Sequence, residues 1–223
     1  MRYPALVIFD MDGLMFDTEK IAFNAWNIAA EHYGFTFERS LFEKFVGLTN
    51  RDILNGMSAE YGEQSPVQDW RAYMKESKFK LIDENLYQPS FKKKGLESLL
   101  TVLKANHVKT AVASSSEMEV IIKYLTATNT KEYIDFRVSG DEVVHGKPDP
   151  EVFLTACRKA NVAPADALVL EDSPAGIRAA RSAGIPSFFI PDFVPESEEL
   201  RGLTTKVFAN LEEVERFLSS LPK

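Results

Sequence analysis

The amino-acid sequence predicts an α/β protein, in which a parallel β-sheet is covered by helices on both faces and carries an inserted block of helices. Two observations support this prediction. From about residue 90 onward, short apolar segments alternate with amphipathic segments of helical length, which is the pattern of βαβ units. Before that point, residues 18–86 contain no segment with the character of a strand, although an apolar strand over residues 5–9 precedes them. That strand finds no partner among the helices, so we expect it to join the later sheet.

The helical block, residues 17–89, is predicted to contain four helices. In the first of them, apolar residues recur at helical spacing, and Gly34 is a typical stop. These apolar residues are Ile21, Ala22, Ala25, Ile28 and Ala29. A second helix begins near residue 41, and a third follows a cap at Thr49 or Asn50. Ser65 and the proline after it form the cap and first turn of the fourth. We expect this block to be a small helical domain inserted into the sheet domain.

The rest of the chain supplies the other strands and helices of the sheet domain. Strands are predicted over residues 108–114, 133–139, 167–170 and 185–190, and helices over residues 96–103, 151–160 and 171–184 and from Asn210 onward. A further helix is expected to begin at Ser116, which can form a capping box with Glu119. Together these segments predict a Rossmann-like, doubly wound parallel sheet built from residues 1–16 and 90–223.

Composition and charge narrow the classes of protein. The chain has 223 residues, and its 26 basic and 33 acidic side chains give a net charge of −7, which disfavours nucleic acid or an anionic membrane as the main partner. Cys157 is the only cysteine in the sequence, so an intramolecular disulfide bond is impossible. The N-terminus lacks an export signal, and no apolar run approaches the roughly 20 residues of a membrane span. We therefore expect a soluble, cytoplasmic protein that is a monomer.

Acidic side chains follow two of the predicted strands directly. Asp10 and Asp12 come after the first strand, and Glu171 and Asp172 come after the strand over residues 167–170. Because ligands of an open parallel sheet bind at the carboxyl ends of the strands, we expect these side chains to meet there. Carboxylates packed together repel one another unless a cation lies among them. Oxygen ligands without histidine or cysteine favour Mg²⁺ over zinc.

A phosphate group is the expected ligand at the same edge of the sheet. Ser114 ends the strand over residues 108–114, and Ser115 follows it and precedes a helix, where hydroxyl and backbone amide groups suit an anion. Lys147, in the segment HGKPDP, is the cation expected to join them. A divalent metal, an anion site, a lysine and a carboxylate without a structural task together indicate phosphoryl transfer to an aspartate.

Four short segments resemble the motifs of a known family. The segments DMDGLMFDTE, VASSS, GKPDP and LEDS match, in order, the four motifs of the haloacid dehalogenase-like hydrolases. They are most similar to the subgroup that includes β-phosphoglucomutase and sugar-phosphate phosphatases. The resemblance covers nearly the whole chain, including a helical cap domain inserted after the first motif. It implies a phosphatase whose substrate is a small phosphorylated metabolite, and Mg²⁺ as the cofactor.

The resemblance also implies a catalytic role for three residues. Asp10 would be the nucleophile that forms an aspartyl-phosphate. Asp12 would protonate the leaving oxygen and then activate water. Lys147 would neutralise charge between the phosphate and the nucleophile, and so belongs to both the catalytic and the phosphate-binding groups.

Binding roles follow from the same resemblance. Ser114 and the amide of Ser115 would hold phosphate oxygens. The metal would be bound by Asp10, by the backbone carbonyl of Asp12, and by Glu171 and Asp172. Asp172 could instead cap the following helix, as could Ser173, and for Asp17 we favour a structural role at the cap or hinge. For Ser116 we favour helix capping over a role in the site.

Two alternatives to a phosphatase remain open. If a second sugar hydroxyl attacks the aspartyl-phosphate in place of water, the enzyme is a mutase. The resemblance implies a histidine four residues before Trp26 in β-phosphoglucomutases, where this chain has Ala22, and basic and amide residues where it has Glu117 and Met118. These departures favour the phosphatase. The other alternative is a sensor that binds a metabolite without catalysis, although every expected catalytic position is filled.

The substrate is not specified by the sequence. The helical block offers polar side chains that could meet a sugar or a second anion, but their spacing does not say which of them face the site. These residues are Asn50, Arg51, Lys75 and Lys78.

Overall fold

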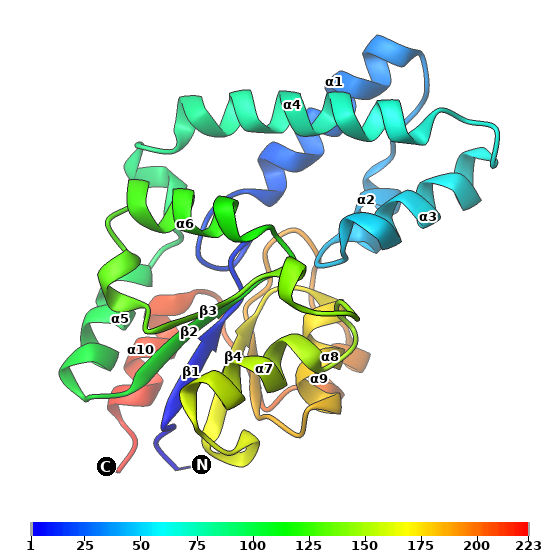
Figure 1. Cartoon of the computed structure of the whole chain (residues 1–223). Helices are drawn as coiled ribbons and strands as arrows, with labels where there is room; N and C mark the ends of the chain where they lie inside the picture. The colour runs from blue at the N-terminus through cyan, green and yellow to red at the C-terminus, as the bar shows by residue number, and fades with distance from the viewer. Residues whose placement is uncertain (1, 223) are drawn as a thin grey trace.

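The computed structural model describes residues 2–222, and a parallel sheet forms its lower part (Figure 1). The strands within these residues are β1 (Leu6–Phe9), β2 (Lys109–Ala113), β3 (Phe136–Val138), β4 (Ala167–Glu171), β5 (Ser187–Phe189) and β6 (Lys206–Val207). They lie in the order β3-β2-β1-β4-β5-β6, and all of the pairings are parallel. Strand β6 was not predicted, because a two-residue strand has no periodicity to detect.

The first strand lies in the middle of the sheet, as its wholly apolar sequence requires. Leu6 pairs with Lys109 of β2 on one side and with Ala167 of β4 on the other. All residues of β1 are buried. A strand that is covered on both faces reads as a continuous apolar run, and this is the pattern that precedes Asp10.

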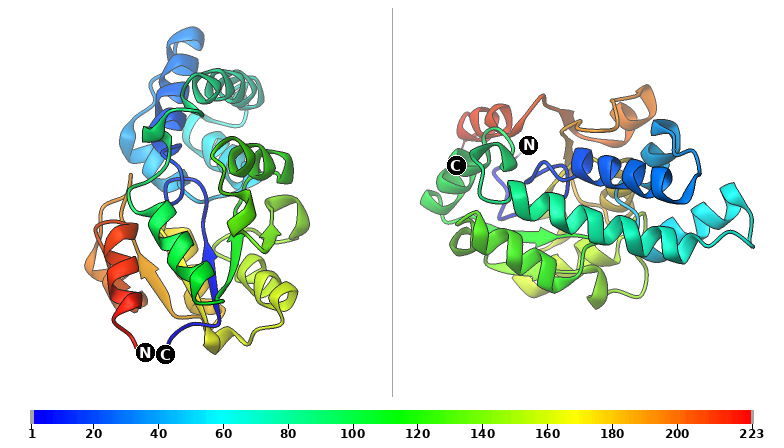
Figure 2. Two further views of the ribbon diagram at one scale, coloured as in Figure 1. Left: turned by 90° about the vertical axis from the view of Figure 1, so that its left-hand side faces the viewer. Right: turned by 90° about the horizontal axis from the view of Figure 1, so that it is seen from above.

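Helices cover both faces of the sheet, which confirms the predicted α/β, doubly wound class (Figure 2). One face packs against α5 (Leu96–Ala105), α6 (Met118–Ala127) and α10 (Leu211–Ser219). The other face packs against α7 (Glu151–Ala160) and α8 (Pro174–Ser182). Helix α9 (Glu198–Leu203) lies between β5 and β6 in the chain. Alternate residues of β1 face the two layers: Val7 and Phe9 join the first core, and Leu6 and Ile8 the second.

Short 3₁₀ turns occupy several of the connections. They are η1 (Pro89–Phe91), η2 (Lys131–Tyr133), η3 (Gly140–Glu142) and η4 (Pro164–Asp166). Turn η2 takes the first residue of the strand predicted over residues 133–139, so β3 is shorter than expected. The capping box predicted for Ser116 and Glu119 is wrong, because α6 begins at Met118 and Glu117 stands at the N-cap position without a side-chain cap bond.

Four helices stand between β1 and α5 in the chain and lie above the carboxyl edge of the sheet (Figure 1). They are α1 (Glu19–Tyr33), α2 (Arg39–Phe45), α3 (Asn50–Tyr61) and α4 (Val67–Asn85), and we call them the cap helices. Their apolar faces form a core of their own, which includes Trp26, Met57 and Trp70. Phe193, from the segment after β5, packs into this core from the sheet domain.

The two connections between the sheet and the cap helices run side by side. The backbone N–H of Asp17 donates to the carbonyl of Phe91 at 2.9 Å, and that of Lys93 donates to the carbonyl of Met15 at 2.9 Å. Lys93 Nζ lies 3.5 Å from Asp17 Oδ1 and 2.6 Å from Asp192 Oδ1. Asp17 therefore makes structural contacts at the hinge.

Within residues 2–222, no helix combines the length and the apolar character needed to cross a membrane. Cys157 lies in α7 and is buried, and burial raises the pKa of its thiol to about 11. The thiol packs with the core beneath the sheet, as its apolar neighbours in the sequence predict.

Replacing Ile8 by alanine is expected to destabilise the protein strongly. Ile8 is fully buried in the central strand, so the substitution removes apolar contacts and leaves a cavity. We expect the free energy of unfolding, measured in urea, to fall by roughly 2–5 kcal/mol. The matched control is Ile122→Ala on α6, where the side chain is 41% exposed and the change is expected to stay within about 0.5 kcal/mol. Equal effects of the two substitutions would contradict the central position of β1.

Candidate active site

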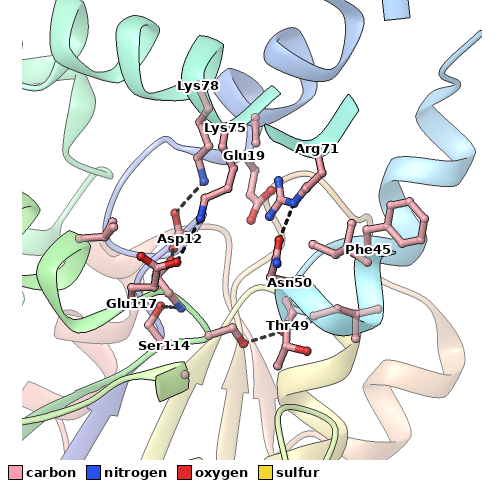
Figure 3. A pocket seen from close by; sticks show the side chains of 18 of the residues that line it. Asp12, Glu19, Phe45, Thr49, Asn50, Arg71, Lys75, Lys78, Ser114 and Glu117 are labelled. Atoms are coloured by element: carbon pink, nitrogen blue, oxygen red, sulfur yellow. Dashed lines mark hydrogen bonds and ion pairs between the residues drawn. The ribbon is translucent and has the colours of Figure 1, made fainter. Parts of the chain in front are cut away.

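A cavity of about 410 Å³ lies between the carboxyl edge of the sheet and the cap helices (Figure 3). Its floor contains Asp10, Asp12 and the serine run after β2, which come from the sheet domain. Its roof and one wall come from α1, α3 and α4. In Figure 3, Arg71, Lys75 and Lys78 of α4 point down into it, and Asn50 of α3 points toward Arg71. The cavity therefore joins residues that are more than 100 positions apart in the chain.

Asp10, Lys147 and Glu171 form a buried cluster at the ends of β1 and β4. Lys147 Nζ donates to Asp10 Oδ1, and it lies 2.7 Å from Glu171 Oε1. Only 1% of the Lys147 side chain is exposed. Burial would lower the pKa of Lys147, but Asp10 and Glu171 outweigh this and raise it, so the ammonium group stays charged. Burial raises the pKa of Asp10, and Lys147 opposes that rise.

Asp12 is held by groups from both the sheet domain and the cap helices. Thr18 Oγ1 donates to Asp12 Oδ1 at 2.7 Å, and Ser116 Oγ donates to Asp12 Oδ2 at 2.8 Å. Lys78 of α4 reaches Asp12 Oδ1 at 3.5 Å. Burial raises the pKa of Asp12, but Lys78 and the two hydroxyl donors outweigh it and hold the pKa below its usual value. Asp12 is therefore a carboxylate in this arrangement.

Asp172 is buried without a hydrogen-bonding partner. Neither of its carboxylate oxygens has a partner, and burial, Glu171 and Asp10 raise its pKa. The capping alternative for Asp172 is wrong, because Ser173 caps α8 by accepting from the backbone N–H of Gly176 at 3.0 Å. The Asp172 carboxylate is thus left free to bind a ligand.

Gly13 makes room for that carboxylate. Gly13 has a φ of +84°, and a Cβ atom there would lie 2.1 Å from Asp172 Oδ2. A side chain at this position is excluded both by the backbone conformation and by the approach of Asp172. The close approach of the Asp172 carboxylate therefore explains why the first motif has a glycine at this position.

The carboxylate cluster fits a hard divalent cation by its chemistry. Its donors are oxygen atoms, and the two unpartnered oxygens of Asp172 are available to a metal. In the described part of the chain, no group of three acidic, histidine or cysteine side chains has the arrangement of a complete metal site. Lys147 instead bridges Asp10 and Glu171. A metal bound here would therefore require these side chains to rearrange. The predicted ligand set of Asp10, Asp12, Glu171 and Asp172 remains a prediction.

The predicted phosphate-binding serines both line the cavity. Ser114 is buried, and its Oγ accepts from the backbone N–H of Ser116 at 3.0 Å. Ser115 Oγ donates to the carbonyl of Gly47, in the segment between α2 and α3, at 2.9 Å. The serine run therefore contacts both the segment between α2 and α3 and Asp12 on the floor of the cavity.

Several residues of the cavity were not assigned to the site from the sequence. These are Glu19, Arg71, Ser116 and Tyr124. Thr18, which binds Asp12 from behind the lining, was not assigned either. Ser116 was interpreted as a helix cap, but its hydroxyl binds Asp12 instead. A signal for Arg71 was present, because residues 71, 75 and 78 share one face of a helix. All four polar cap residues left undecided by the sequence line the cavity, namely Asn50, Arg51, Lys75 and Lys78.

Glu19 is a buried acidic residue on the cap side of the cavity. Burial raises its pKa to about 7; Lys78 opposes this rise, and Asp12 adds to it. Figure 3 shows the Glu19 carboxylate and the Arg71 guanidinium pointing into the same part of the cavity. Burial lowers the pKa of Arg71 to about 10, so its guanidinium is still charged at neutral pH.

Comparisons with known proteins agree with this geometry. Residues 7–190 match the family model described as haloacid dehalogenase-like hydrolase. The chain belongs to this family of hydrolases. The predicted resemblance is therefore confirmed, and so is the prediction of an enzyme of the phosphatase type.

Relatives and solved structures of the hydrolase family cover most of the chain. A "Phosphorylated carbohydrates phosphatase" of Thermotoga maritima is 32% identical over 183 residues, 82% of this chain and 83% of that protein. A Drosophila melanogaster protein named "Probable pseudouridine-5'-phosphatase" is 34% identical over 218 residues, 95% of this chain and 91% of that protein. A crystal structure of β-phosphoglucomutase from Clostridium difficile has a TM-score of 0.80 at 25% identity, and the match covers 96% of this chain and 93% of that one.

Replacing Asp172 by asparagine is expected to stabilise the hydrolase in EDTA while it removes activity. A carboxyl group whose pKa is raised by folding destabilises the folded state at neutral pH. We therefore expect the free energy of unfolding at neutral pH to rise. The gain should vanish below the ordinary pKa of aspartate, about 3.9, where the carboxyl group is protonated in both states.

The control for this experiment is Asp166→Asn, which makes the same change at an exposed position before β4. This control substitution should leave the midpoint of unfolding in urea unchanged. A loss of stability in Asp172→Asn in EDTA would show that the Asp172 carboxylate is satisfied in the folded protein, contrary to the geometry described above.

Proposed function

We propose that the protein is a Mg²⁺-dependent phosphatase that hydrolyses a small phosphorylated carbohydrate through an aspartyl-phosphate on Asp10. The observation that carries this proposal is the buried contact of Lys147 with Asp10 and Glu171 at the floor of a cavity large enough for a small metabolite. The names of the phosphatases to which the chain is similar support the class of substrate.

In the first half of the reaction, an oxygen of Asp10 attacks the phosphorus atom and the bond from phosphorus to the leaving oxygen breaks. Lys147 lies against Asp10, so its charge can neutralise both the attacking carboxylate and the phosphate. Asp12 gives a proton to the leaving alcohol. Its pKa is low in the free enzyme, but the negative phosphate next to it favours the protonated form once substrate is bound.

In the second half, water attacks the phosphorus atom of the aspartyl-phosphate and Asp10 is regenerated. Asp12, now a carboxylate, accepts a proton from that water, and inorganic phosphate leaves. The hydroxyl groups of Thr18 and Ser116 fix the Asp12 carboxylate from two sides and stabilise its charged form for this step. One side chain thus serves as acid and then as base.

The metal would be held by Asp10, Asp172, Glu171 and the backbone carbonyl of Asp12. Bound there, Mg²⁺ would offset the repulsion between the carboxylates and the phosphate. Ser114 and the amide of Ser115 would hold the remaining phosphate oxygens. These assignments rest on the oxygen-only donor set and on the free carboxylate of Asp172.

A phosphosugar mutase is the second candidate, because the chain is similar in structure to a β-phosphoglucomutase. Two residues of the cavity favour the phosphatase over it. Ala22 supplies no proton-transferring group on α1, and Glu117 places a negative charge beside the serine run. A metabolite sensor is the non-enzymatic alternative, and it predicts ligand binding without turnover.

Release of inorganic phosphate separates the three candidates. With Mg²⁺, we expect hydrolysis of p-nitrophenyl phosphate and of some members of a panel of sugar phosphates. Adding EDTA in excess should abolish it, and restoring Mg²⁺ should recover it. Isomerised sugar phosphate without free phosphate would indicate the mutase, and tight binding without any turnover would indicate the sensor.

Asp10→Asn is expected to lower kcat by at least about a thousandfold, because the attacking oxygen is lost. The circular dichroism spectrum should remain that of the wild type. Asp69→Asn, on the exposed side of α4, is the matched control and should retain full activity. If Asp10→Asn kept substantial activity, the proposed covalent mechanism would be wrong.

A further inference from the structure

The charged groups on the cap side of the cavity are paired with one another. The cavity is lined by five acidic and four basic residues. Lys75 Nζ lies 3.0 Å from Glu117 Oε1, and Lys78 Nζ lies 3.5 Å from Asp12 Oδ1. In the absence of substrate, each lysine therefore faces a carboxylate.

The two arginines of the cavity differ in their partners, because Arg51 faces a carboxylate and the polar partner of Arg71 is the neutral Asn50. Arg71 Nε donates to Asn50 Oδ1 at 2.8 Å, and the charge of Glu19 acts on the same guanidinium. Arg51 lies at the rim, is two-thirds exposed, and has its Nε 4.0 Å from Asp52 Oδ1. At Arg51, Lys75 or Lys78, a second phosphate on the substrate would therefore have to compete with a carboxylate.

Glu117 is the acidic residue that is placed most directly to repel a second phosphate. It follows Ser114–Ser116, so a ligand that places one phosphate on the serine run brings the rest of its body past the Glu117 carboxylate. Lys75, which crosses the cavity from α4, neutralises this carboxylate in the absence of a second anion (Figure 3). A second phosphate would be repelled by Glu117 and would compete with it for Lys75.

The remaining surface of the cavity suits an uncharged body with hydroxyl groups. Glu19, Asn50 and Arg71 offer hydrogen-bond donors and acceptors from three cap helices. Trp26 and Met74 add apolar surface between them. A volume of about 410 Å³ lies at the lower end of the roughly 300–1,000 Å³ typical of small-molecule sites.

We propose that this cavity selects substrates that carry a single phosphate group on an uncharged, hydroxylated body, and that Glu117 is the residue that discriminates against a second phosphate. This inference rests on the proposed phosphatase function, and it names the substrate class of that same site. Glu117 acts by its charge. Among the described lining residues on the serine side of the cavity, Asp141 is the other acidic one, and its carboxylate accepts from the backbone N–H of Met118 at 3.0 Å.

The test uses pairs of substrates that differ only in a second phosphate. Suitable pairs are glucose 6-phosphate with glucose 1,6-bisphosphate, fructose 6-phosphate with fructose 1,6-bisphosphate, and ribose 5-phosphate with ribose 1,5-bisphosphate. Phosphate release with Mg²⁺ gives kcat/KM for each. We expect the wild-type enzyme to favour the monophosphate of a hydrolysed pair by about fivefold, the effect of one repulsive contact with a carboxylate whose side chain is 58% exposed.

Charge variants assign the preference to Glu117. Glu117→Gln should reduce the preference by about two- to fivefold, and Lys75→Gln should increase it, because the Glu117 charge is then unpaired. Glu119→Gln removes the same charge two residues further along, at an exposed position outside the cavity, and should leave the preference unchanged. High salt should narrow the wild-type preference, which a purely structural role of Glu117 would not produce.

Three outcomes would overturn the inference, and they can be told apart. Wild-type enzyme that hydrolyses bisphosphates as well as monophosphates contradicts the selection of one phosphate. Equal effects of Glu117→Gln and Glu119→Gln contradict the role of Glu117. Failure of the wild type to hydrolyse p-nitrophenyl phosphate and every sugar phosphate contradicts the proposed function, and this inference with it.

Discussion

The repulsion among buried carboxylates is the constraint on which the rest of this structure depends. Strands β1 and β4 are neighbours and run in the same direction, so Asp10, Glu171 and Asp172 necessarily emerge at one edge of the sheet. Burying these charges together is costly unless cations are present. Lys147 supplies one of these cations and is itself held by two of the carboxylates. Asp172, which it does not contact, marks where further positive charge is required.

Asp12 connects this cluster to the cap helices. Its carboxylate is bound by a hydroxyl at the start of α1, by the serine run after β2 and by Lys78 from α4. The ionisation of Asp12 therefore depends on how the cap helices lie over the sheet. The side-by-side connections at residues 15–17 and 91–93 hold the base of those helices, and Phe193 packs among them from the sheet domain. The same cap helices supply most of the polar surface that a substrate meets.

Much of the fold was predictable because its signals are local. The apolar run before Asp10 indicated a buried central strand, and the alternation after residue 90 indicated a doubly wound parallel sheet. The errors also have local causes. Strand β6 is too short for any periodicity, and η2 shortened β3. Ser116 has the spacing of a capping box with Glu119, but its hydroxyl makes a tertiary hydrogen bond to Asp12 that helix-capping rules do not consider.

The sequence by itself determined the fold class and the chemical groups of the candidate site, because strand ends, motif spacing and residue types are encoded locally. It predicted Asp10, Asp12, Ser114, Lys147, Glu171 and Asp172 as candidates, and folding brings them to one edge of the sheet or into the cavity above it. Only the tertiary structure decided which cap residues meet that edge and how their charges pair. Lys75 and Glu117 meet through the packing of α4 over the sheet, and Arg71 meets Asn50 through the packing of α4 with α3. Such pairing has no periodic or local signal in the chain.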